Sequence, residues 1–146
     1  MIVRLMPEQI AEHWDAIKHA ACQSNAISHT IEEQYCNKLF EMLLLEKYHA
    51  WVGYQVVDGQ REYMGILITG FIRDDLTGQL NLLVYGLYAF RVLDDDLIIE
   101  GLQTLKMFAR AQNCTKIFGY TSNPRLIKFL KDKDYLTDTI CFTSEV

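Results

Sequence analysis

The sequence predicts an α/β fold of the mixed α+β type, with helices on both faces of one central sheet. Apolar residues recur at helical spacing over the first third of the chain, and three strand-like segments separated by turn signals follow. A helix, a short strand and another helix come next. A three-strand meander followed by a crossover helix between neighbouring strands favours a sheet with antiparallel and parallel pairs. We expect about six to seven strands and about four flanking helices.

The N-terminal part is predicted to hold one strand and two helices. Residues 2–5 form a short strand, and Pro7 suits the first turn of a helix that ends near residues 24–25. Thr30 and Glu33 have the spacing of a capping box, which predicts the start of a second helix. The apolar stripes of these helices are Ile10, Trp14, Ile17 and Ala21 in the first and Ile31, Tyr35, Leu39, Met42 and Leu43 in the second.

The middle of the chain predicts a meander of three strands. Residues 49–57 and 63–72 are rich in aromatic and β-branched side chains, and Asp58-Gly59 between them is a hairpin turn signal. Asp74 and Asp75 belong to a second turn, where turn formation is a commoner role for aspartate than catalysis. Residues 80–90 are almost continuously apolar, which is typical of a central strand covered on both faces. We expect Tyr85 and Tyr88 in the core or in the wall of a cleft.

The C-terminal part predicts a helix, a strand, a helix and a last strand. Asp94 can cap the first of these helices, and Asn113 suits its left-handed end. Gly101, inside that helix, is expected to allow close packing against the sheet. Residues 116–120 read as a strand, Asn123-Pro124 as a helix start, and residues 136–143 as the last strand.

Composition narrows the class of protein. The 146 residues suit a single domain spanning residues 1–146, and 50% of them are hydrophobic. The formal net charge of -5 argues against a nucleic-acid partner, and the longest apolar stretch is far shorter than the roughly 20 residues of a membrane span. The cysteines and histidines are scattered, so we expect reduced thiols, no metal site and a cytoplasmic protein.

The order of elements resembles that of the GNAT (GCN5-related N-acetyltransferase) superfamily over nearly the whole chain. Residues 109–117 look like its junction between a helix and the fifth strand, and residues 123–130 look like its N-x-x-A-x-x-x-Y helix. Asp134-Tyr135 stands where that family usually has Gly-Phe. The resemblance extends to short GNAT-like proteins of phages and prophages, many of which lack the usual phosphate loop.

The resemblance implies an acetyl-CoA site whose phosphate loop is degraded here. In the family, the helix after the fourth strand starts with Q/R-x-x-G-x-G/A, whose glycines let backbone N–H groups reach the CoA pyrophosphate. The matching residues 93–98 contain no glycine and place Asp94, Asp95 and Asp96 at that helix start. Three carboxylates there stabilise the helix through its dipole and repel a diphosphate. An alternative is that they bind a metal or a cationic substrate.

The resemblance also locates candidate residues for chemistry. The family's usual general acid is a tyrosine of the fourth helix, and the matching residue here is Leu130. Tyr120 and Tyr135 are the substitutes that the sequence offers. The expected cofactor wall, if acetyl-CoA binds, is Tyr88, Ala89, Phe90, Arg91 and Val92, with Asn123 opposite.

Two hypotheses for function follow. The first is a non-catalytic structural or assembly protein of phage type, in the host cytoplasm or in the virion, with a homo-oligomer or a virion protein as its partner. The alternative is a divergent acyl-CoA-dependent N-acetyltransferase acting on an amine that the sequence does not identify. Arg91 could hold a phosphate or be a solvated loop residue. Basic residues of the last helix could help to bind phosphate or form a solvated mixed face: Arg125, Lys128, Lys131 and Lys133.

Overall fold

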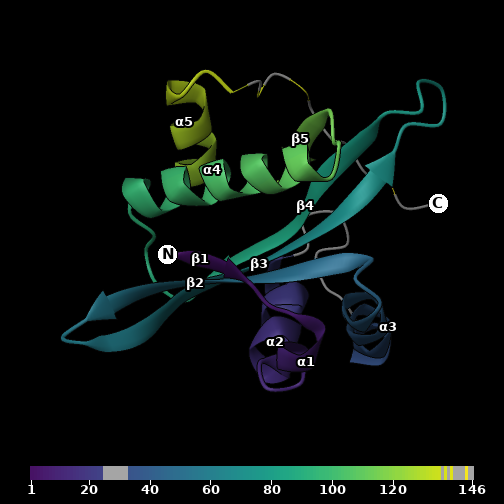
Figure 1. Ribbon diagram of the computed structural model, residues 1–146. Helices are drawn as coiled ribbons and strands as arrows, with labels where there is room; N and C mark the ends of the chain where they lie inside the picture. Colours follow the sequence, from purple (N-terminus) through teal and green to yellow (C-terminus); the bar gives the residue numbers. More distant parts are fainter. Residues whose placement is uncertain (25–32, 136, 138, 140–143, 145–146) are drawn as a thin grey trace.

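The computed structural model describes residues 1–24, 33–135, 137, 139 and 144. Over these residues the chain forms five strands and five helices (Figure 1). The strands are β1 (Ile2–Arg4), β2 (Tyr48–Val57), β3 (Gln60–Arg73), β4 (Leu80–Ala89) and β5 (Lys116–Gly119). The helices are α1 (Pro7–Ile10), α2 (Trp14–Ser24), α3 (Glu33–Leu44), α4 (Asp95–Ala111) and α5 (Pro124–Asp132).

All five strands belong to one mixed sheet in the order β1-β2-β3-β4-β5. The first three pairings are antiparallel, and β4 pairs with β5 in parallel, as the crossover through α4 requires. The predicted mixed sheet is therefore confirmed. The described residues hold fewer strands than the predicted six to seven, and the expected last strand at residues 136–143 lies almost wholly outside them.

Each face of the sheet carries its own apolar core, and Figure 1 shows the helices divided between the two faces. Helices α1, α2 and α3 cover one face, and α4, with α5 beyond it, covers the other. The first core contains Leu5, Ile10, Ile17, Ala20, Ala21, Leu43, Ala50, Val52, Ile66 and Ile68. The second contains Trp51, Leu67, Leu82, Leu105 and Ala109. Because β2 and β3 contribute to both cores, they form the centre of the domain.

Several local signals in the sequence are confirmed. Asp58 and Gly59 have φ of 51° and 77°, the left-handed pair that a tight hairpin requires. Asn113 has φ of 58° at the end of α4, where the Cys114 amide donates to the Ala109 carbonyl at 2.8 Å. A Cβ at Gly101 would lie 2.6 Å from Ile2 Cδ1, so this glycine does allow α4 to approach the sheet.

Two predictions for the N-terminal helices were incomplete. The first predicted helix is divided into α1 and α2 by a turn at residues 11–13, where the Trp14 amide donates to the Ala11 carbonyl at 3.4 Å. In α3, Tyr35 is 58% exposed, whereas its neighbour Cys36 is 2% exposed. Leu43 is buried and Leu39 and Met42 are half-buried, as predicted, so among the described residues of this stripe only Tyr35 is wrong, and Cys36 takes its place on the buried face. The capping Thr30 lies outside the described residues.

In the described part of the chain, no helix combines the length and the apolar character needed to cross a membrane.

Candidate functional site: the β4–β5 separation and the start of α4

The two parallel strands of the sheet stay together for only four residue pairs. Asn81 to Val84 of β4 pair with Lys116 to Gly119 of β5, and β4 then continues to Ala89 without a further pair to β5. A β-bulge lies where this pairing ends, because Thr69 pairs with Val84 and Ile68 with Gly86, which leaves Tyr85 as an extra residue. The β5-facing edge of residues 85–89 is therefore not paired with β5.

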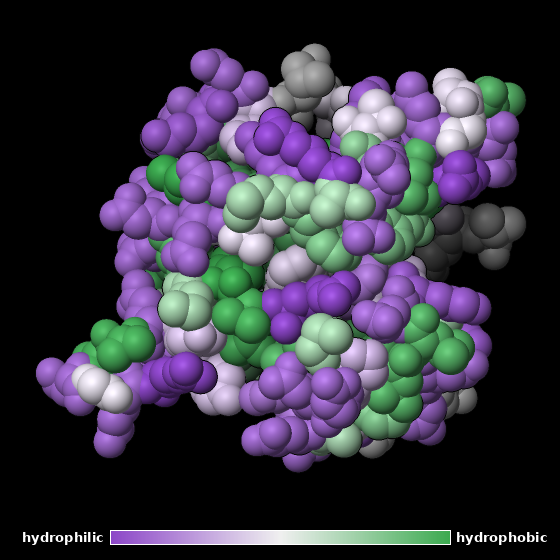
Figure 2. All heavy atoms as spheres, viewed as in Figure 1, coloured by the Kyte–Doolittle hydropathy of each residue, from purple (hydrophilic) through white to green (hydrophobic). Residues whose placement is uncertain are grey.

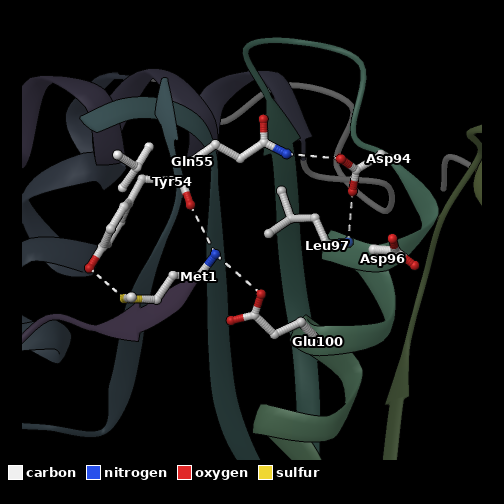
Figure 3. Close-up of a pocket in the computed structure, with 8 residues that line it drawn as sticks. Met1, Tyr54, Gln55, Asp94, Asp96, Leu97 and Glu100 are labelled. Carbon is white, nitrogen blue, oxygen red and sulfur yellow. Dashed lines mark hydrogen bonds and ion pairs between the residues drawn. The ribbon is translucent and has the colours of Figure 1, made fainter. Parts of the chain in front are cut away.

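The start of α4 is closed by the chain's own side chains (Figure 3). Asp94 has the extended backbone of an N-cap, and its Oδ1 accepts a hydrogen bond from the Leu97 amide at 2.8 Å. Its Oδ2 accepts another from Nε2 of Gln55, on β2, at 2.8 Å. One backbone donor at this helix terminus is thus already satisfied by a carboxylate, and the cap is held against the sheet.

The other carboxylates of the predicted triplet surround this terminus. Asp95 Oδ1 lies 3.6 Å from the Arg125 guanidinium of α5. Asp96 lines an open hollow of about 450 Å³ with residues of the N-terminus, of β2 and of the start of α4 (Figures 2 and 3): Met1, Tyr54, Gln55, Val56, Asp94, Leu97 and Glu100. The Met1 ammonium group lies in this hollow and donates a hydrogen bond to the Tyr54 carbonyl at 2.9 Å. The same nitrogen forms an ion pair with Glu100 Oε2 at 3.2 Å. Apart from that ammonium group, the charged groups that line the hollow are acidic.

The start of α5 is closed in the same way. Asn123 Oδ1 accepts hydrogen bonds from the amides of Arg125 and Leu126 at 3.0 and 3.3 Å. Asn123 was predicted both as a cap and as a cofactor contact, and the cap is confirmed. Its side-chain oxygen is engaged with the helix.

The predicted cofactor wall at the end of β4 is in part occupied by contacts within the protein. Tyr88 is half-buried and packs edge-on against the rings of His19, on α2, and Phe90. Arg91 forms an ion pair with Glu62 of β3 at 3.0 Å, and its side chain is 61% exposed. Val92 is 79% exposed, and Ala89 and Phe90 are exposed as well.

The two candidate tyrosines lie in different surroundings. Tyr120 directly follows β5, is 41% exposed and packs edge-on against Phe118. The ring of Tyr135 lies under the Lys106 ammonium group of α4, with the nitrogen 5.0 Å from the ring centroid. Leu130, which the resemblance matched to a tyrosine, is half-buried in α5. The Asp134 backbone has φ of 58°, a left-handed conformation that glycine adopts most easily.

The other predicted charges have structural roles. Asp74 Oδ1 accepts hydrogen bonds from the amides of Leu76 and Thr77 at 2.9 and 3.0 Å, which holds the pKa of this carboxyl below its usual value. It is a turn former, as expected. Lys128 pairs with Asp132 one turn further along α5, in line with a solvated mixed face. Within the described residues, no three His, Cys, Asp or Glu side chains are arranged to hold a metal ion.

Sequence reasoning missed a second hollow, of about 260 Å³, between α3 and the sheet. Its lining residues are Tyr35, Lys38, Leu39, Met42, Tyr48 and Tyr85. The Tyr48 and Tyr85 rings meet edge-on at 5.4 Å, and Tyr85 is the bulged residue of β4. The expectation that Tyr85 lies in the core or a cleft wall is confirmed. Tyr85 enters the wall of this hollow as a bulged residue, and a single sequence does not reveal where a bulge falls.

Comparison with known proteins identifies the fold. No family model matches the chain, and no curated protein matches it in sequence. Solved structures do match over 100% of the chain. One is a GNAT family acetyltransferase of Staphylococcus aureus (12% identity, 98% of that chain, TM-score 0.63). Another is the ribosomal-protein-alanine N-acetyltransferase of Brucella melitensis biovar Abortus 2308 (15% identity, 99% of that chain, TM-score 0.64). A third is AAC(6')-Iy in complex with a CoA-containing bisubstrate analogue (14% identity, 97% of that chain, TM-score 0.67). The chain therefore has the GNAT acetyltransferase fold.

Proposed function

We propose that this chain is a GNAT-fold protein that does not hold acyl-CoA by its diphosphate, and that it acts as a non-catalytic binding or assembly protein. The observation that carries this proposal is the start of α4. Asp94 caps the helix there, and Asp95 and Asp96 add two further carboxylates beside it. The residues present do not fit the diphosphate of CoA.

The physical argument combines hydrogen bonding and charge. A helix N-terminus binds phosphate because its first amides are unpaired and carry partial positive charge. Here the Leu97 amide donates to Asp94, and Arg125 of α5 is paired with Asp95. Two unit charges about 4 Å apart interact by about 4 kcal/mol near a protein surface. A diphosphate would meet such repulsion from carboxylates and would have to displace one to reach the Leu97 amide.

Leu130 adds an independent argument. A leaving thiolate needs a proton donor, and a leucine side chain has none. Two features that GNAT chemistry uses are therefore replaced in the same chain, while the fold is kept. A fold does not by itself maintain an activity once the site residues are changed.

The proposed role is contact with another protein, either a second copy of this chain or a component of an assembly such as a phage particle. The hairpin of β2 and β3 extends beyond the helices in Figure 1. Val56, Val57 and Tyr63 on this hairpin are 64%, 42% and 52% exposed. Exposed apolar side chains on both faces of a projecting hairpin support a contact surface there.

The test is a titration with acetyl-CoA, followed by thermal unfolding. We expect no shift in melting temperature at 1 mM, whereas a ligand at 100 times its Kd would add about 2.7 kcal/mol to stability. The variant Asp95→Gly/Asp96→Gly keeps the Asp94 cap and removes two charges, so it should gain a measurable shift. Asp58→Asn/Asp75→Asn removes the same charge from two distant turns and should gain none. A clear shift with the unchanged protein would overturn the proposal.

A second function, acyl transfer by a divergent site, is favoured by one observation. The β4 edge beyond Val84 is not paired with β5, and an open edge between diverging parallel strands offers backbone groups to a ligand. This function predicts thiol release from acetyl-CoA in the presence of an amine, and it predicts the thermal shift that the first proposal excludes.

A further inference from the structure

We propose that Cys22 and Cys36 form a redox-active thiol pair, which closes to an intramolecular disulfide when the protein meets a small-molecule disulfide such as oxidised glutathione. The pair is independent of the proposed function above, because neither thiol lies at the start of α4 or at the β4–β5 separation.

The geometry that supports this pair is the contact of the two sulfur atoms. Cys22 lies near the end of α2, Cys36 lies in α3, and their Sγ atoms are 3.6 Å apart. The thiols are not joined in the structure. A disulfide has an S–S length of about 2.05 Å, so the sulfurs must approach by about 1.5 Å. Rotation about χ1 of each cysteine, together with a small shift of the helices, can supply that movement.

The two thiols differ in access, which sets the order of the chemistry. Cys22 is half-buried, whereas Cys36 is 2% exposed. The Cys22 thiolate attacks one sulfur of the small disulfide, forms a mixed disulfide and releases one small thiolate. The Cys36 thiolate then attacks Cys22 Sγ, forms the protein disulfide and releases the second small thiolate. Two protein thiols are oxidised, one small disulfide is reduced to two thiols, and these take up the two protons.

Closure would act on the wall of the tyrosine-lined hollow. Tyr35, Lys38 and Met42 of α3 line that hollow, and Cys36 belongs to the same helix. The end of α2 is itself packed against the sheet, because a Cβ at Gly86 would lie 2.6 Å from Ser24 Oγ. A Cys22–Cys36 bond would therefore tie α3 through α2 to β4. The oxidised protein should hold this hollow in one arrangement and unfold at a higher temperature.

The experiment equilibrates the reduced, full-length chain with oxidised glutathione and measures intact mass, peptide maps and melting temperature. We expect a loss of two hydrogens, a crosslinked peptide pair containing Cys22 and Cys36, and a rise in melting temperature on the order of 5–10 °C that dithiothreitol reverses. Oxidised glutathione is used instead of peroxide because peroxide also oxidises methionine.

Cys114→Ser is the matched control, since Cys114 packs against the core on the α4 face of the sheet, away from the Cys22–Cys36 contact, and burial raises the pKa of its thiol and so lowers its thiolate fraction. That variant should keep the mass loss and the thermal shift. Cys22→Ser should lose both, and Cys36→Ser should stop at a glutathione adduct on Cys22. Should Cys36→Ser fail to fold, the peptide map of the unchanged chain still shows whether Cys22 is bonded to Cys36. A map showing only glutathione adducts, a bond to Cys114 or Cys141, or a crosslinked dimer would overturn the proposal.

Discussion

The Asp95 carboxylate of α4 lies 3.6 Å from the Arg125 guanidinium of α5, and this ion pair joins the starts of the two helices that flank β5. Both side chains are about half-exposed, so the pair adds little to stability. Its effect on binding is larger, because a guanidinium close to the start of α4 is already paired with a carboxylate. An anion that reached this terminus would compete with Asp95 for that cation and with Asp94 for the Leu97 amide.

The cap itself gives the first prediction. Replacing Asp94 with alanine removes the hydrogen bonds from Leu97 and Gln55, and should lower the free energy of unfolding by about 1 kcal/mol. Asp94→Asn keeps a side-chain oxygen that can cap the helix, so it should cost clearly less. Urea unfolding followed by circular dichroism measures both. Equal losses in the two variants would show that charge, and not the cap, is the contribution of Asp94.

His49 gives a prediction for pH. Its side chain is 5% exposed, and its ring lies edge-on to Phe71 and Phe108 at 5.1 and 5.0 Å. Burial, together with the nearby positive charge of Arg4, lowers the pKa of His49 from 6.5 to about 4, against a smaller opposing effect of Glu46. The unfolded chain therefore binds a proton at a pH where the folded chain does not. The stability due to the neutral ring is complete above pH 6.5 and is lost as the pH falls toward 4.

The size of this effect is about 3 kcal/mol over the whole window. The measurement is the free energy of unfolding in urea at several pH values between 7 and 4.5. His49→Leu removes the titrating group, so the difference between the two proteins should change with pH by up to about 1.4 kcal/mol per unit. Parallel curves would mean that the ring is protonated without loss in the folded state. The comparison is needed because carboxyl groups also titrate at the acid end.

The fold was predictable wherever a few neighbouring residues determine the geometry. Asp58-Gly59, Asn113 and Asn123 act through left-handed backbone or through hydrogen bonds to amides two or three residues away. Such signals are contained in a short segment, so they can be read from the sequence without knowing which other elements pack against that segment. The mixed sheet followed from the same logic, since a meander and a crossover are both read in chain order.

The remaining features depend on contacts between distant segments. The four-pair limit of β4 with β5, the bulge at Tyr85 and the contact between Cys22 and Cys36 are set by tertiary packing. The exposure of Tyr35 and the burial of Cys36 in α3 have a simpler cause. Cysteine behaves as a small apolar residue, so counting Cys36 as apolar would have placed it, and not Tyr35, toward the core. The carboxylates of Asp94, Asp95 and Asp96 stood out only because the resemblance places glycines at the start of this helix.

Two facing glycines give a matched pair of variants. Gly53 of β2 and Gly65 of β3 are register partners, but their surroundings differ. A Cβ at Gly65 would lie 2.7 Å from the Tyr88 carbonyl oxygen, whereas the nearest atom to a Cβ at Gly53 would be 3.8 Å away. Gly65→Ala should therefore force β3 and β4 apart and cost about 1–3 kcal/mol. Gly53→Ala should be close to neutral. Thermal unfolding separates the two, and a neutral Gly65→Ala would show that β4 can move freely at Tyr88.

A buried hydrogen bond between β2 and β3 gives the last prediction. The Trp51 indole Nε1 donates to Thr69 Oγ1 at 2.9 Å, and the two residues are 3% and 0% exposed. Thr69→Val keeps the volume and leaves the indole N–H without that partner, which should cost about 1–3 kcal/mol. In a Trp51→Phe background the same replacement should cost much less, because no indole N–H remains to be satisfied. Urea unfolding of the four proteins gives a coupling energy of about 1 kcal/mol or more. A coupling near zero would mean that the indole finds another acceptor, and that the side-chain bond adds nothing to the backbone pairing of β2 with β3.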